Sequence, residues 1–197
     1  LKSRVLRISR KASKLLGVNM PTATTCVKPS GTVSQLVDSA SGVHPRFSKY
    51  YIRRYRIAAR DPLFKMMKDM GIPAHPEVGQ KKKNATTWVL EFPIKSPDNC
   101  ITRKDVTALE QLRHYKNLQH SWCEHNASMT VYVREDEWFE VGNWVYQNWD
   151  IINGVSFLPY DGGHYKLAPY EEIDHRTYER LIKKLPRIDY KQLSKYE

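Results

Sequence analysis

Residues 128–159, SMTVYVREDEWFEVGNWVYQNWDIINGVSFLP, contain the pattern that decides the fold. Their first six residues are rich in β-branched side chains and predict a strand. Residues 135–149 are rich in aromatic residues and predict a helix, and Asn153 with Gly154 predicts a turn into a second strand over 155–159. The stretch therefore predicts a strand–helix–strand unit, which is typical of α/β proteins.

The rest of the chain repeats this alternation. Further helices are predicted over 3–16, 61–71, 104–122 and 174–185, and further strands over 22–27, 50–59 and 86–94. In 61–71, Asp61 is a typical N-cap, Pro62 suits the first helical position and Gly71 ends the helix. We expect the five strands, which begin near residues 22, 50, 86, 128 and 155, to share one sheet or partial barrel.

Length and composition are those of a soluble globular protein. The 197 residues, 41% hydrophobic and 27% charged, suit one domain or a large piece of one. No apolar stretch approaches the roughly 18 residues of a membrane span. The basic N-terminal stretch lacks the apolar core of a secretory signal, and the missing initiator Met hints at an excerpt.

Cysteine usage predicts the reducing cytoplasm and no structural metal. The three cysteines are an odd number without C-x-x-C spacing, and the seven histidines show no metal-ligand spacing. We therefore expect no metal site and interpret all three cysteines as packing residues, namely Cys26, Cys100 and Cys123.

The stretch TTCVKPSGTVS, residues 24–34, predicts a phosphate site. After the strand come Pro29 and a small loop, and a short helix is expected from about Val33. Free N–H groups at a helix start attract anions, and a glycine lets an anion approach the backbone closely. Hydroxyl donors come from Ser30, Thr32 and Ser34. The GxxxxGK[ST] pattern of a Walker loop is absent, and an ordinary N-cap and turn is the alternative reading.

Six segments in order resemble the large chains of ribonucleotide reductases, in particular the adenosylcobalamin-dependent (class II), triphosphate-reductase-like branch. They cover nearly the whole chain from about Leu16 onwards. The segments are KPSGTVSQL (28–36), SASGVHPRFSKYYIRRYRI (39–57), TTWVLEFPIK (86–95), QLRHYKNLQHSWCEHNASMTVYV (111–133), NWVYQNWDIINGVSFLPYDGGHYKLAPYEE (143–172) and LPRIDYKQLSKYE (185–197).

This resemblance implies a ten-stranded α/β barrel, of which residues 1–197 would be a single region from the C-terminal part. It implies an enzyme that reduces ribonucleotides to deoxyribonucleotides, with adenosylcobalamin as cofactor and a dithiol as reductant. In such enzymes the cofactor generates a thiyl radical on a cysteine inside the barrel. Substrate phosphates would be bound by residues of one loop, namely Pro29, Ser30, Gly31, Thr32, Val33 and Ser34.

The chain also departs from the family pattern. The family's radical loop carries an Asn-x-Cys-x-Glu arrangement, and neither this arrangement nor the C-terminal cysteine pair occurs here. We therefore assign no catalytic residue to this chain and expect the N-terminal part of the enzyme, in the same or a separate chain, to supply the radical cysteine. The isolated 197 residues are expected to be inactive.

Two other classes of function remain open. The net charge is 32 − 21 = +11, which favours anionic partners. A nucleic-acid-binding module would use Arg53, Arg54, Arg56 and the lysines 81–83, with interleaved tyrosines. Alternatively, the chain could be a non-catalytic reductase-like subunit that holds a partner chain. Neither a membrane nor a nucleic acid is the expected partner.

Overall fold

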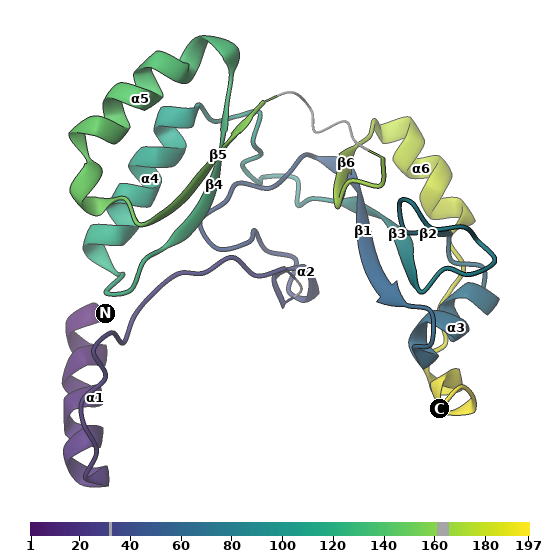
Figure 1. Ribbon diagram of the computed structural model, residues 1–197, viewed down its shortest axis with the longest axis horizontal. Coiled ribbons are helices and arrows are strands. Elements are labelled where there is room, and N and C mark those ends of the chain that lie inside the picture. Colours follow the sequence, from purple (N-terminus) through teal and green to yellow (C-terminus); the bar gives the residue numbers. More distant parts are fainter. Residues whose placement is uncertain (32, 161–165) are drawn as a thin grey trace. The chain divides into compact units, whose positions relative to one another are not determined.

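The computed structural model describes residues 1–31, 33–160 and 166–197 and shows a mixed α/β protein (Figure 1). The chain forms two compact units. Unit 1 comprises Leu1–Arg46 and Asn99–Tyr160, and unit 2 comprises Phe47–Asp98 and Asp161–Glu197. No helix among the described residues is both long and apolar enough to cross a membrane.

Unit 1 contains a pair of parallel strands. Its elements are α1 (Lys2–Leu16), α2 (Val33–Leu36), α4 (Ala108–Ser121), β4 (Ser128–Val133), η1 (Glu135–Glu137), α5 (Trp138–Gln147), η2 (Trp149–Ile151) and β5 (Gly154–Pro159). Strands β4 and β5 pair in parallel, with Ser128 opposite Gly154. The strand–helix–strand unit predicted from residues 128–159 is therefore confirmed.

The core of unit 1 lies between β4 and two helices. Alternate residues of β4 are buried, as expected of a strand with one face in a core. Val131 and Val133 pack in one cluster with Leu112 and Tyr115 of α4 and with Val141 of α5. Figure 1 shows α4 and α5 together on one side of the two strands.

Helix α4 begins later than the sequence pattern predicts. Its N-cap is Thr107, whose hydroxyl accepts the N–H of Glu110 at 3.1 Å, and the Glu110 carboxylate accepts the N–H of Thr107 at 2.8 Å. This reciprocal arrangement is a capping box, and it satisfies two backbone donors that would otherwise lack partners. The cap sets the first helical residue at 108, rather than 104.

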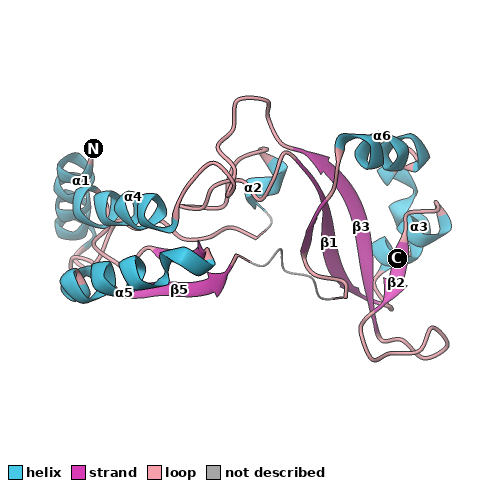
Figure 2. Ribbon diagram, turned by 90° about the horizontal axis from the view of Figure 1, so that it is seen from above, coloured by secondary structure: helices cyan, strands magenta, loops and turns pink. Residues whose placement is uncertain are grey.

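Unit 2 contains an antiparallel sheet with the strand order β2-β3-β1-β6. Figure 2 shows its two long strands, β1 and β3, side by side. The elements are β1 (Tyr50–Ala58), α3 (Pro62–Asp69), β2 (Ala74–Pro76), β3 (Thr87–Lys95), β6 (Tyr170–Glu172), α6 (His175–Lys184) and η3 (Tyr190–Lys195). In α3 the carboxylate of Asp61 accepts the N–H of Leu63 at 2.9 Å, so the predicted N-cap is confirmed.

The prediction that five strands share one sheet is wrong. The strands near residues 50 and 86 lie in the antiparallel sheet of unit 2, and those near 128 and 155 form the parallel pair of unit 1. Alternation of helix and strand along a sequence shows which elements exist, but it does not show which strands pair.

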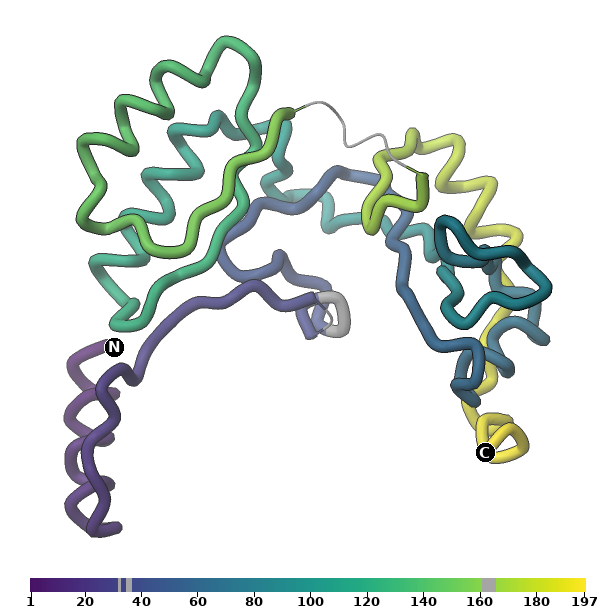
Figure 3. The backbone as a smooth tube through the Cα atoms, viewed as in Figure 1, coloured from purple at the N-terminus to yellow at the C-terminus, as the bar shows by residue number. Residues whose placement is uncertain are grey.

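The strand predicted over 22–27 is also wrong. This stretch is an open connection from α1 towards α2 (Figure 3). Its buried residue Thr25 accepts the N–H groups of Glu124 and His125 with a single carbonyl, at 2.8 and 3.1 Å. Two bonds to one carbonyl tie the chain to the turn after α4, but they do not make the ladder that defines a strand.

Candidate functional site

The candidate site is the 29–34 loop of unit 1. Helix α2 begins at Val33 as predicted, but it is a single turn. Because peptide dipoles sum along a helix, so short an element adds little field, and individual N–H and O–H groups must supply any affinity for an anion. Pro29, Gly31 and Val33 are exposed, Ser30 is half-buried and Ser34 is buried. Thr32 lies outside the described residues.

Ser30 is the centre of hydrogen bonding in this loop. Its Oγ accepts the N–H of Ser34 at 3.0 Å, and its carbonyl accepts the hydroxyl of Ser34 at 2.6 Å. Its own N–H donates to the Oγ of Ser41 at 2.8 Å, and the Ser41 hydroxyl donates back to the Ser30 carbonyl at 3.0 Å. Both donors of Ser34 are thus used inside the loop, so Ser34 shapes the loop.

Neither close packing nor a left-handed backbone requires a glycine at position 31. A Cβ atom built at this position would meet no atom within 4 Å, and the backbone does not adopt the left-handed conformation that favours glycine. The loop is therefore open on the side of Gly31, where a ligand could approach the backbone.

A second turn, residues 38–46, closes against the base of the loop. Gly42 has φ +62°, and a Cβ there would lie 2.8 Å from the carbonyl oxygen of Lys28. The buried guanidinium of Arg46 donates to the Ser39 carbonyl and to the Asp38 carboxylate, both at 2.7 Å. Sequence reasoning missed this turn as part of the site, although Gly42 lies in the stretch SASGVHPRF that carries the family resemblance.

Lys28 connects the start of the loop to the strand region of unit 1. Its Nζ donates to Asn126 Oδ1 at 3.2 Å and to Ser128 Oγ at 3.0 Å, and Ser128 is the first residue of β4. The ammonium group is exposed, so it also contributes positive charge at the entrance of the loop.

The arginines considered for nucleic-acid binding are engaged within unit 2. The guanidinium of Arg54 is buried between the carboxylates of Glu91 and Glu171. Arg53 lies over the ring of Tyr170, 4.3 Å from its centroid, and Arg56 pairs with Glu77. These contacts engage the three arginines that motivated that interpretation, whereas the lysines 81–83 are exposed.

The cysteines differ in burial. Cys123 belongs to the core of unit 1, so its predicted packing role is confirmed. Cys26 is exposed, so the prediction is wrong for this residue, because the stretch 22–27 is a connection and not a buried strand. Cys100 is partly buried. Among the described residues no three His, Cys, Asp or Glu side chains gather as a metal would require.

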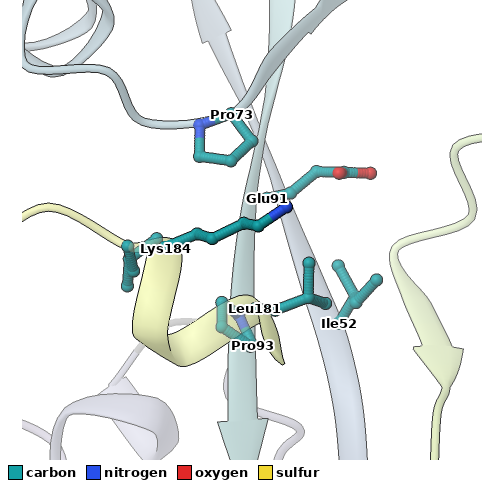
Figure 4. Close-up of a pocket in the computed structure, with 7 residues that line it drawn as sticks. Ile52, Pro73, Glu91, Pro93, Leu181 and Lys184 are labelled. Carbon is teal, nitrogen blue, oxygen red and sulfur yellow. The ribbon is translucent and has the colours of Figure 1, made fainter. Parts of the chain in front are cut away.

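Unit 2 has a small pocket between its sheet and α6 (Figure 4). Its walls are mainly apolar, from Ile52, Pro73 and Pro93 together with Leu181 and Leu185. Its volume is about 90 Å³. That is well below the roughly 300 Å³ at which pockets for small-molecule ligands and cofactors begin.

Known proteins similar to this chain were found by sequence and by structure, although no family model matches it. The chain is 34% identical over 179 residues to the adenosylcobalamin-dependent ribonucleoside-triphosphate reductase of Lactobacillus acidophilus, matching 89% of this chain and 24% of the relative. It is 33% identical to a probable adenosylcobalamin-dependent ribonucleoside-triphosphate reductase of Dictyostelium discoideum, matching 95% of this chain and 25% of the relative.

Comparison with solved structures finds a protein of the same kind as the sequence relatives. A crystal structure of a B-12 dependent (class II) ribonucleotide reductase matches with a TM-score of 0.80 and 31% identity, covering 99% of this chain and 27% of that one. The chain thus spans about a quarter of the length of the proteins it matches.

Proposed function

We propose that the chain forms the C-terminal part of the catalytic barrel of an adenosylcobalamin-dependent ribonucleoside-triphosphate reductase, because it is similar to about a quarter of the length of such enzymes. The complete enzyme would convert ribonucleotides to deoxyribonucleotides. The observation that carries the proposal is a similarity that extends over nearly the whole chain in both sequence and structure.

Within that enzyme, the 29–34 loop would bind the phosphates of the substrate. The open side of Gly31 would admit a phosphate to the backbone, and the Ser30 hydroxyl, which in the described bonds acts as an acceptor, could donate to it. Lys28 adds a positive charge next to the loop. Ser34 and Ser41 would hold the loop in shape through their bonds to Ser30.

The cofactor and the remaining partners belong to the proposal as well. Adenosylcobalamin, when bound, supplies the radical that starts reduction in such enzymes. The pocket beside α6 does not fit its corrin ring, because about 90 Å³ holds only a few waters. The N-terminal part of the barrel and a dithiol reductant would complete the enzyme. The three cysteines are free, which is consistent with a cytoplasmic location.

The phosphate role of the loop is tested by Gly31→Ala in the complete enzyme. A methyl group on the open side should keep the phosphate away from the backbone and raise KM for the ribonucleotide at least about tenfold, the loss of one hydrogen bond to a charged group. The matched control is Gly142→Ala in α5, where an added Cβ also meets nothing within 4 Å and KM should not change. An unchanged KM in an active Gly31→Ala enzyme would exclude phosphate binding at this loop.

The role as part of a larger enzyme has its own test. The isolated 197 residues should form no deoxyribonucleotide with adenosylcobalamin and a dithiol, because hydrogen abstraction from ribose needs a cysteine held near contact distance in a closed site. Addition of a chain that carries the Asn-x-Cys-x-Glu loop should restore turnover if the two are natural halves. Turnover by the isolated residues, lost on mutating one of their cysteines, would contradict the proposal.

A further inference from the structure

We propose that His44 is a positioning residue that ties the 29–34 loop to strand β4 and so sets the position of the phosphate site relative to this strand. The inference rests on the proposed function of that loop. His44 is half-buried in the 38–46 turn. Its imidazole joins two parts of unit 1 that lie 86 residues apart in the sequence.

The hydrogen bonds of the ring define its tautomer. The backbone N–H of Thr130 in β4 lies 2.9 Å from Nε2, and an amide N–H can only donate. Nε2 is therefore the acceptor, and in the neutral ring the single hydrogen sits on Nδ1. Nδ1 lies 2.7 Å from the carbonyl oxygen of Ser41 and donates to it. The ring is thus a two-ended connector with one donor and one acceptor.

Ser41 extends this connection to the loop. Its carbonyl, besides accepting from the ring, accepts the backbone N–H of His44 at 3.1 Å. Its Oγ exchanges two hydrogen bonds with Ser30, at 2.8 and 3.0 Å. One residue therefore separates the imidazole from Ser30. The close approach of Gly42 to Lys28 presses the same turn onto the base of the loop.

Strand β4 holds the loop at two points. Lys28, at the start of the loop, bonds to Ser128, and His44 bonds to Thr130 two residues further along the same strand. The bond to Ser128 is made by its side chain, whereas the bond to Thr130 is made by its backbone N–H, which points along the sheet and not out of its face. The two anchors thus tie the loop to the first three residues of β4 through one side chain and one backbone amide. Displacements of about 1 Å in a binding group cost large factors in an enzyme, so such anchors matter for substrate affinity.

Three substitutions at His44 in the complete enzyme separate the two bonds. His44→Asn retains a donor near the position of Nδ1 but loses the acceptor for Thr130, and His44→Gln retains an acceptor near Nε2 but loses the donor to Ser41. His44→Ala loses both. If the ring works as a connector, each substitution breaks it, and all three should raise KM for the ribonucleotide about tenfold while kcat changes less than about threefold. His114→Asn, at an exposed position in α4, is the control and should leave both constants unchanged.

A role confined to stabilising the turn gives a different result. In that case His44→Asn would have the same KM as the unmodified enzyme, because it keeps the bond to Ser41. An unchanged KM in His44→Asn would overturn the proposal. If the His44 variants do not fold, Ser41→Ala takes their place, since it removes the bridge to Ser30 and leaves the imidazole intact. It should also raise KM about tenfold, and an unchanged KM would overturn the proposal.

The test also separates this inference from the proposed function. An increase of KM in Gly31→Ala without any increase in the His44 variants would reject the connector and leave the phosphate loop standing. No increase in either, in an active enzyme, would reject the phosphate loop and the connector together.

Discussion

The antiparallel sheet of unit 2 and the parallel pair β4–β5 of unit 1 satisfy their polar groups in different ways. In unit 2 the central strand β1 has a neighbouring strand on each side, and its charged side chains pair across the sheet. In unit 1 an amide of β4, that of Thr130, bonds to a histidine side chain from a loop. Polar contacts thus join strands of the sheet in unit 2, whereas in unit 1 a hydrogen bond from a strand holds a loop in place.

The charge cluster of unit 2 spans three strands. Arg54 of β1 donates to Glu91 of β3 at 2.6 Å and to Glu171 of β6 at 2.5 Å, and it also donates to the Ala168 carbonyl at 3.1 Å. Burial of the guanidinium opposes its charge, but the hydrogen bonds to Glu171 and Glu91 outweigh this cost, so the pKa of Arg54 is raised. A paired and fully bonded buried charge is stable, whereas the same carboxylates without the arginine would repel each other.

We therefore predict the largest effect on stability for a substitution that removes this charge cluster. Arg54→Met should lower the free energy of opening of unit 2 by about 3 kcal/mol, since it removes the buried guanidinium that bonds to both Glu91 and Glu171. Arg56→Met, on the same strand, removes an ion pair with Glu77 that is 38% exposed on the arginine side and should cost less than about 1 kcal/mol. Hydrogen exchange of the β1 and β3 amides measures both values. Equal costs would show that the cluster does not stabilise the sheet.

Local signals in the sequence predicted most of the helices and the long strands. Caps such as Asp61 act within one turn, and alternating burial such as that of residues 128–133 needs only the strand itself. The short strands β2 and β6 were missed because three residues give too little pattern, and their pairing depends on β3 and β1. The grouping of strands into sheets is likewise a long-range property.

The candidate site shows the same division. The PSGT stretch was recognisable because Gly and hydroxyl residues follow Pro29, and the helix start at Val33 was placed correctly. The partners of Ser30 were not predicted, because Ser41 is 11 residues away and no local rule connects the two. His44 was not recognised either, since its acceptor role depends on a strand that begins 84 residues later at Ser128.

The second prediction concerns the loop side of the comparison. Gly42→Ala in unit 1 places a residue with a side chain at φ +62° and brings its Cβ within 2.8 Å of the Lys28 oxygen. Gly79→Ala in unit 2 has the same kind of backbone, φ +84°, but its Cβ meets nothing within 4 Å. A side chain on this left-handed backbone should lower the free energy of unfolding of each variant by about 1 kcal/mol. The collision with the Lys28 oxygen should lower it by roughly 1 kcal/mol or more in Gly42→Ala alone.

Thermal unfolding of the two glycine variants checks the difference, and KM for the ribonucleotide checks its consequence. Only Gly42→Ala should raise KM, because only this turn rests on the loop. Equal losses of stability with unchanged KM would show that the contact between Gly42 and Lys28 is not part of the site.

The smallest expected effects are those of pH on the helix caps of the two units. In α4 the amide and hydroxyl of Thr107 lower the pKa of Glu110 from its ordinary value of 4.5. In α6 the bonds from Thr177 to the carboxylate of Asp174 lower the pKa of that group from its ordinary value of 3.8. A carboxyl group whose pKa is lower in the folded protein stabilises the fold fully above the unfolded pKa, and this contribution is lost as the pH falls through the folded value.

The amide variants Glu110→Gln and Asp174→Asn keep the shape and the hydrogen-bond acceptor of each cap but remove its titration. At pH 7 each variant should therefore unfold at a slightly lower temperature than the unmodified protein, because a neutral acceptor binds an N–H less strongly than a carboxylate does. The difference should begin to narrow as the pH falls below 4.5 for Glu110 and below 3.8 for Asp174, where the unfolded carboxyl groups take up protons. It should close as the pH falls through the lower folded pKa of each group, where the folded carboxylates become neutral too. Unfolding temperatures measured from pH 3 to pH 7 give this comparison directly. A difference that stays constant over the whole range would mean that the charge of these caps does not contribute to the stability of either helix.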